Sequence, residues 1–159
     1  METNTSTTVI TESKVAFNIK KFGFLNIKGS VADFKGNVVF DENNLENAHF
    51  DVSVSTVTIN TGNPKRDEHL KSNDFFYVKE FPTISFKSSE IKKDKGLFLA
   101  NGKLTMLKTT HDILITFKYE NGALKGSFSL NRLDYELGSK FPSFIVGKNV
   151  EIAINVKLK

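Results

Sequence analysis

The side chains that could carry out chemistry are few and far apart in this chain of 159 residues. The three histidines, His49, His69 and His111, form no i,i+4 pair and no H-E-x-x-H sequence, and there is no cysteine. Metal sites and thiolate nucleophiles need such residues close together. Neither a G-x-S-x-G elbow nor a Gly-rich phosphate loop occurs. We therefore expect no metal, no cofactor and no catalytic centre, and we expect His69 to orient a backbone group.

Two arginines stand out because the other basic residues are all lysine. Arg66 precedes Asp67, and Arg132 lies two residues before Asp134. A guanidinium offers a planar fork of donors that an ammonium lacks. The favoured interpretation is structural: Arg66 pairs with Asp134, or Arg132 with Asp67, tying two segments together. In the alternative, one arginine meets the head group of a ligand.

The composition excludes some classes of protein. The net charge is +4, and the basic residues are mostly scattered lysines, whereas base and phosphate recognition favours arginine. We expect no nucleic-acid partner. No apolar run approaches the ~20 residues of a membrane-spanning helix.

The chain begins with the polar residues 1–12, which lack the apolar stretch of a signal peptide. We expect this segment to be flexible and residues 13–159 to form one domain. A cytoplasmic protein is expected if Met1 is the true start. The alternative is a periplasmic protein whose signal peptide has been removed.

Apolar and polar residues alternate through most of the chain, as in β-strands with one buried face. The apolar members are Val15, Phe17 and Ile19; Ala48, Phe50, Val52 and Val54; Ile84 and Phe86; Phe98, Ala100, Leu104 and Met106; Ile113, Ile115, Phe117 and Tyr119; Leu124, Phe128 and Leu130; and Val150, Ile152, Ile154, Val156 and Leu158. Residues 27–41 add one bent strand or two short ones. The pattern predicts eight or nine antiparallel strands.

Irregular elements interrupt this alternation. A phase change at Val57 and Ile59 indicates a bulge, and Asn121-Gly122 is a strong hairpin signal. Asn63 and Pro64 suit the start of a helix, so a short helix is expected at about 64–72. Residues 131–149 form a long irregular stretch, and such loops are often functional.

Alternation alone does not decide between a sandwich and a closed barrel, or between a filled barrel and a hollow one. Small residues on the inward phase, Ala48, Ala100, Gly102 and Gly126, suggest room inside. Ordinary alternation of large and small side chains explains them equally well.

Several segments resemble the YceI-like family of polyisoprenoid-binding or lipid-binding proteins. They are TINTGNPKRDEHLKSNDFF with FPTISFKSSEI, VAFNIKKFGFLNIKGSVADFKGNVVFD, ANGKLTM, FSLNRLDY and VGKNVEIAINV, and together they extend from about Ser13 to Lys159. The resemblance implies a single lipocalin-like antiparallel β-barrel of about eight strands with one short helix. It also implies an elongated apolar tunnel that binds a polyisoprenoid, quinone or similar lipid without catalysing a reaction. Where many members have Asp-Phe-Gly, this chain has Asp134-Tyr135-Glu136.

We therefore expect non-enzymatic binding, transport or storage of a long-chain amphiphile. The predicted lining consists of Phe17, Phe50, Phe86, Ile115, Phe117, Phe128 and Ile152, with Phe75, Phe76 and Phe144 near one end. Phe141, Phe144 and Ile145 suggest an apolar mouth. Transient membrane contact and a monomer or homodimer are expected. The alternative is a filled-core barrel that acts as a structural or interaction module through its lysine-rich surface.

Overall fold

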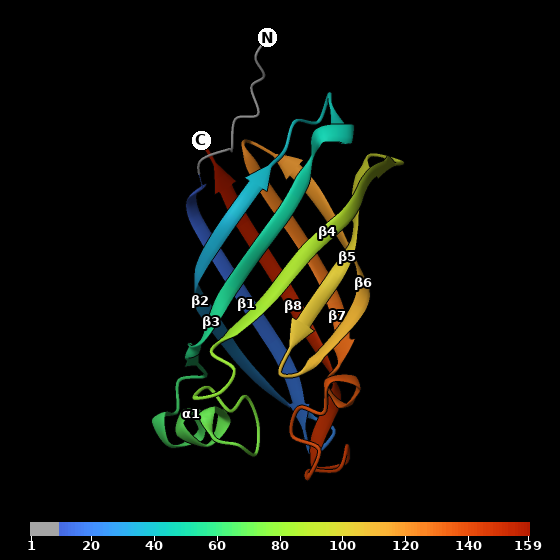
Figure 1. Ribbon diagram of the computed structural model, residues 1–159. Coiled ribbons are helices and arrows are strands. Elements are labelled where there is room, and N and C mark those ends of the chain that lie inside the picture. The colour runs from blue at the N-terminus through green and yellow to red at the C-terminus, as the bar shows by residue number, and fades with distance from the viewer. Residues whose placement is uncertain (1–9) are drawn as a thin grey trace.

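Eight strands close into one antiparallel barrel in the computed structural model, which describes residues 10–159 (Figure 1). Each strand pairs with the next, and the first pairs with the last. The strands are β1 (Ile10–Lys21), β2 (Leu25–Val39), β3 (His49–Asn60), β4 (Thr83–Asp94), β5 (Leu97–Met106), β6 (Thr109–Glu120), β7 (Ala123–Asn131) and β8 (Val146–Leu158). Helix α1 (Pro64–Lys71) and the 3-10 turns η1 (Leu45–Asn47) and η2 (Arg132–Tyr135) complete the fold. The predicted all-β barrel with one short helix is confirmed.

Strand β1 begins earlier than the expected domain boundary at residue 13. Ile10 pairs with Leu158 and Glu12 with Lys157, so the last three residues of the segment expected to be flexible belong to the barrel wall. Residues 1–9, the rest of that segment, lie outside the described residues.

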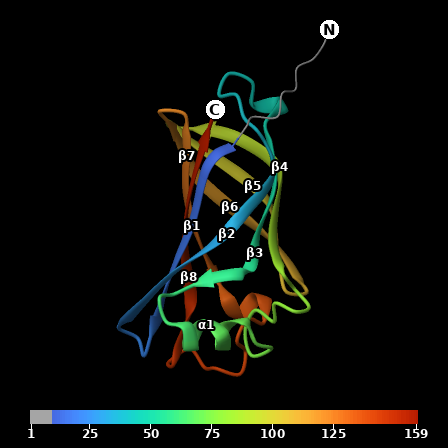
Figure 2. The same cartoon turned by 90° about the vertical axis from the view of Figure 1, so that its left-hand side faces the viewer.

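The two ends of the barrel differ. Figures 1 and 2 show α1 and η2 at one end, and η1 and the chain's C-terminus at the other. We call them the α1 end and the η1 end. The β6–β7 connection at the η1 end is the predicted hairpin: Asn121 and Gly122 have φ of 52° and 77°, as a tight turn with two left-handed residues requires.

Strands β2 and β3 are bent where their pairing shifts. Residues 27–39 belong to one strand, whose register against β3 slips between Ala32 and Lys35. The predicted bulge in β3 lies between Ser55 and Asn60. There, Thr58 Oγ1 accepts a bond from the Ala32 N–H at 2.7 Å and donates to the Ser55 carbonyl at 2.6 Å, so the unpaired backbone is satisfied locally.

Helix α1 starts as the sequence predicts. The Asn63 side chain accepts from the Arg66 N–H at 3.1 Å, and Pro64 occupies the first helical position. Leu70 packs against a cluster that includes Val31 and Val54, which anchors the helix at its end of the barrel. Within residues 10–159, no helix is long and apolar enough to cross a membrane.

Aromatic rings fill the interior at the η1 end. The Phe40 ring lies 5.2 Å from Phe98, 5.7 Å from Phe117 and 5.1 Å from Tyr119, and Phe50 lies 5.6 Å from Phe117. We call these five rings the aromatic plug. Edge-to-face and tilted contacts of this kind are favourable, so these rings pack together inside this end of the barrel.

Candidate functional site

A cavity of about 520 Å³ occupies the barrel between the aromatic plug and the α1 end. All eight strands contribute to its wall, and the lining side chains are mainly valine, isoleucine, leucine and phenylalanine. The volume falls in the range of roughly 300–1,000 Å³ typical of small-molecule sites. The interior is therefore hollow, which decides between the two packings that alternation left open.

Nine of the ten predicted lining residues lie on this cavity: Phe17, Phe50, Phe75, Phe76, Phe86, Ile115, Phe117, Phe128 and Ile152. Phe144 does not, and its placement in the lining was wrong. It lies just before β8 in an irregular segment and is 74% exposed, because alternation gives no face to a residue outside a strand.

Glycines make room for large rings within the wall. A Cβ on Gly102 would lie 2.6 Å from a ring carbon of Phe86 on the neighbouring strand, and Gly29 is covered in the same way by Phe17. Gly126 lines the cavity, whereas Ala48 and Ala100 pack in the buried core. Of the four small residues, Gly126 therefore contributes directly to the open space.

Polar and charged groups line the cavity mainly where it reaches the α1 end. Lys20, Lys21, Arg66 and His69 belong to the lining there, together with Thr61. An elongated apolar space with charged groups at one end suits an amphiphile that has a long tail and a polar head.

Arg66 and Asp67 both bond to Thr61. Arg66 donates from Nε to Thr61 Oγ1 at 2.8 Å and from Nη2 to the Thr61 carbonyl at 2.9 Å. The Asp67 carboxylate accepts from the Thr61 N–H at 3.0 Å and from its hydroxyl. The predicted partners Asp134 and Arg132 are not involved, because the three residues are close in sequence and complete a local network.

Arg132 is buried and bonds to backbone carbonyls rather than to an acid. The residue is 1% exposed. Its acceptors are the carbonyls of Gly147 (2.9 Å, from Nε), Leu137 and Gly138 (2.9 and 2.7 Å, from Nη1), and Phe141 and Val146 (both 2.7 Å, from Nη2). Burial lowers the pKa of this guanidinium. The predicted Arg132–Asp67 pair is wrong: the five N–H groups of Arg132 hold the loop before β8 against η2.

Close packing around Arg132 depends on Gly138. This residue has φ of +66°, and a Cβ there would lie 2.6 Å from the Phe75 ring and 3.2 Å from Arg132 Nη1. Only glycine combines this left-handed backbone with so close an approach.

Asp134 contacts strand β6 through its backbone carbonyl. Its carbonyl lies 2.9 Å from His111 Nε2, whose ring meets Tyr135 edge-on at 5.0 Å. Burial, followed by the charge of Asp134, raises the pKa of the Tyr135 hydroxyl to about 12. Glu136, at the position where relatives of the resembled family carry glycine, adopts φ of 58°. The predicted pairing of Asp134 with Arg66 is also wrong.

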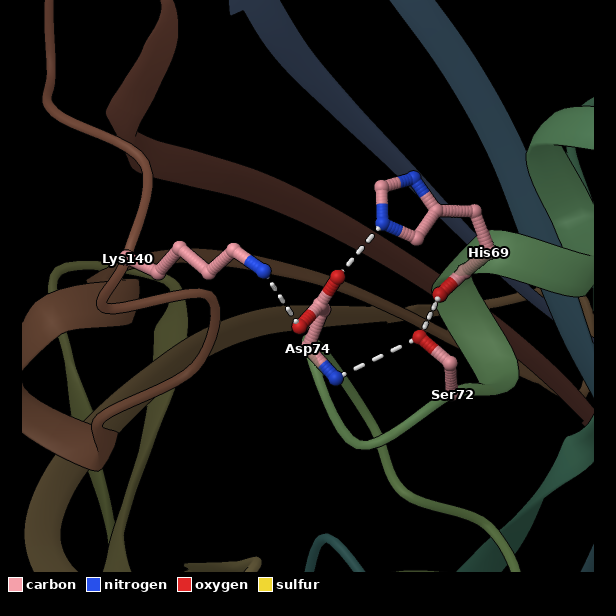
Figure 3. Close-up of polar contacts among 4 residues, drawn as sticks. All are labelled: His69, Ser72, Asp74 and Lys140. Atoms are coloured by element: carbon pink, nitrogen blue, oxygen red, sulfur yellow. Dashed lines mark hydrogen bonds and ion pairs between the residues drawn. The ribbon is translucent and has the colours of Figure 1, made fainter.

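A second polar cluster joins α1 to the loop before β8 (Figure 3). The Asp74 carboxylate lies 2.9 Å from His69 Nε2 and 3.0 Å from Lys140 Nζ. Ser72 Oγ donates to the His69 carbonyl at 2.6 Å and accepts from the Asp74 N–H at 3.3 Å. Because its side chain bonds to a carboxylate, His69 does not orient a backbone group as predicted. We call His69, Ser72, Asp74 and Lys140 the mouth clasp.

Stacked aromatic rings reinforce the mouth clasp. Phe75 and Phe141 lie 5.0 Å apart and nearly parallel, and the His69 ring meets both edge-on. Of the three residues of the predicted apolar mouth, Phe141 and Ile145 line the cavity and Phe144 does not. Sequence patterns did not indicate Lys140, because one lysine among many in an irregular segment carries no signal.

We predict that the contacts of Asp74 in the mouth clasp are sensitive to acid. The hydrogen bond from His69, followed by that from Lys140, lowers the pKa of Asp74 from its usual 3.8. The clasp therefore stabilises the fold above pH 3.8, and this contribution is lost as the pH falls through the lower pKa of the folded state. An NMR titration of the Asp74 carboxyl carbon should give a midpoint below 3.8 that rises more in His69→Phe than in Lys140→Ala. Identical midpoints in all three proteins would contradict the clasp.

The three histidines lie on different elements: His49 in β3, His69 in α1 and His111 in β6. In the described part of the chain, no three side chains of His, Asp or Glu gather in a way that could hold a metal ion.

The sequence matches a known protein family and several bacterial relatives. A family profile described as the YceI-like domain matches residues 7–158. A UPF0312 protein of Pseudomonas aeruginosa is 30% identical over 154 residues, which cover 90% of this chain and 79% of that protein. For a UPF0312 protein of Photorhabdus laumondii, with 30% identity over 101 residues, the match covers 64% of this chain and 53% of the relative. The chain thus spans about half the length of that relative.

Solved structures share the fold. BcnA of Burkholderia cenocepacia matches with a TM-score of 0.83 at 19% identity, over 91% of this chain and 94% of that one. A polyisoprenoid-binding domain from Saccharophagus degradans matches with a TM-score of 0.71 at 11% identity, over 96% and 97% of the two chains. At these low sequence identities, the similarity shows a shared barrel fold.

Proposed function

Because the chain belongs to the YceI-like family, we propose that it binds a long-chain amphiphile, such as a polyisoprenoid or quinone-type lipid, without catalysing a reaction. The observation that carries this proposal is the apolar cavity of about 520 Å³ inside the barrel. The polyisoprenoid-binding domain with the same fold supports an isoprenoid tail.

Hydrocarbon burial is sufficient to hold such a ligand. Burying one CH₂ group contributes about 0.8 kcal/mol, so a five-carbon prenyl unit offers roughly 3–4 kcal/mol. Association costs an estimated ~4–15 kcal/mol. One unit therefore barely offsets the cost of binding, whereas several bind tightly. A cavity lined by phenylalanine and aliphatic side chains selects for the length of the tail.

The head group belongs at the α1 end, beside Arg66. Arg132 also borders the cavity, but each of its five N–H groups already donates to a carbonyl. Arg66 is less buried, and its guanidinium bonds to Thr61 alone. We assign the contact with a phosphate or quinone oxygen to Arg66, supported by Lys20 and Lys21.

The alternative, a filled-core barrel that acts only as an interaction module, requires inner side chains to meet across the barrel axis. They do so in the aromatic plug but not along the rest of the interior.

A series of prenyl alcohols tests the proposal. Geraniol, farnesol, geranylgeraniol and longer homologues should bind with affinities that rise by roughly 200- to 1,000-fold for each added unit. The gain should stop once the cavity is full. Competition against a fluorescent alkyl probe measures these affinities. Affinity that does not depend on chain length would contradict the proposal.

A further inference from the structure

An exposed apolar surface lies beside the cavity mouth. It is formed by the β1–β2 hairpin and the segment before β8, which are joined by a bond from the Phe22 N–H to the Ile145 carbonyl at 2.9 Å. Phe24 is 70% exposed, Phe22 53% and Phe144 74%. Three phenylalanines this exposed in neighbouring segments mark an interaction site rather than scattered surface residues. We call residues 20–25 and 142–148 the mouth face.

The mouth face lies in the most basic part of the chain. Residues 18–28 and 137–150 contain Lys20, Lys21, Lys28, Lys140 and Lys148 and no aspartate or glutamate, while the whole chain has 22 basic and 18 acidic residues. Lys21 Nζ lies 5.3 Å from the centre of the Phe22 ring. Of the five lysines, Lys140 is paired with an acid, Asp74.

The face continues into the cavity. Lys20, Lys21, Phe22 and Ile145 border both. The apolar side chains of Phe22 and Ile145 thus connect the mouth face to the cavity wall.

We propose that the mouth face docks on the surface of a bilayer that contains anionic phospholipids. The rings of Phe22, Phe24 and Phe144 enter the interfacial region, and the surrounding lysines contact the phosphates. Aromatic rings at the interface and basic residues next to anionic lipid are the usual elements of such contacts. A second copy of this chain fits the face poorly, because a two-fold interface would set its lysines against identical lysines.

The docking rests on exposed residues and is independent of the ligand. Docking would turn the mouth toward the bilayer. The transfer of a lipid between the bilayer and the cavity in this orientation rests on the proposed function. The two can therefore fail separately.

Sedimentation with vesicles tests the docking. The protein should bind vesicles of phosphatidylcholine mixed with phosphatidylglycerol, bind pure phosphatidylcholine at least tenfold more weakly, and lose affinity as salt rises. The double variant Phe24→Ser/Phe144→Ser should bind the anionic vesicles at least tenfold more weakly than the native chain. So should Lys28→Glu/Lys148→Glu. The matched control is Leu114→Ser, which removes an exposed apolar side chain on β6 and should leave vesicle binding unchanged.

The outcomes separate the two proposals. Phe24 and Phe144 lie outside the cavity lining, so the double variant should bind prenyl alcohols in solution as the native chain does. Native-like vesicle binding by the double variant, or none by the native chain, overturns the docking. So does a change from dimer to monomer in that variant on size-exclusion chromatography, because the face would then belong to a second copy. Vesicle binding as expected without any binding of prenyl alcohols would overturn the proposed function and leave the docking in place.

Discussion

Arg132→Lys is expected to lower the free energy of unfolding by about 3–5 kcal/mol. Arg132 is 1% exposed, and its guanidinium donates five bonds to five carbonyls of the 137–147 segment. A lysine ammonium has three donors, so at least two of the five carbonyls lose their partner. Each hydrogen bond to a charged group contributes about 1.5–3 kcal/mol. Urea unfolding monitored by circular dichroism measures the loss.

Arg66→Lys is the matched control for this variant. Arg66 is less buried and bonds to Thr61 through one side-chain and one backbone oxygen, so the same substitution should cost at most about 1 kcal/mol. Equal losses in the two variants would contradict the role assigned to Arg132. If Arg66 meets the head group, Arg66→Lys should instead weaken ligand binding at nearly unchanged stability.

Ile154→Trp is expected to weaken binding of a long prenyl alcohol by about a thousandfold. Ile154 lines the cavity next to Gly126, its pairing partner on the neighbouring strand β7. An indole there occupies space that the tail would fill. Excluding five carbons of the tail removes about 4 kcal/mol of burial, or about three decades in Kd. Because the ring fills an apolar void, the protein should fold with little loss of stability.

The control for Ile154→Trp lies next to it on β8. Ala153 is exposed on the outer surface, so Ala153→Trp adds a larger side chain at the same height of the barrel without entering the cavity. Its affinity for prenyl alcohols should equal that of the native protein. If Ile154→Trp binds as tightly as Ala153→Trp, the ligand does not occupy the barrel.

The regular elements could be predicted from local sequence because each depends on a local rule. Alternation identifies the inner face of a strand, and residues such as Phe17, Phe86 and Ile152 follow it onto the cavity. Asn121-Gly122 and Asn63-Pro64 indicate a turn and a helix start through backbone preferences of their own.

The hollow centre and the mouth could not be predicted in this way. Alternation says which side chains point inward, but not whether they meet across the axis, since that depends on how the strands close. In the irregular segment before β8 there is no period to follow. For this reason the sequence does not show that Phe144 points to solvent, or that Arg132 bonds to the carbonyls of its own loop rather than to an acid.

The central claim is that an apolar tail fits inside the barrel, and diffraction from crystals soaked with a long-chain alcohol brominated at its tail end tests it most directly. The anomalous signal locates the bromine without assumptions about the ligand. The peak should lie within the barrel, against Phe50 and Phe117, where the cavity meets the aromatic plug. Bromine found only on the outer surface, with the inner side chains closed over the axis, would contradict the account.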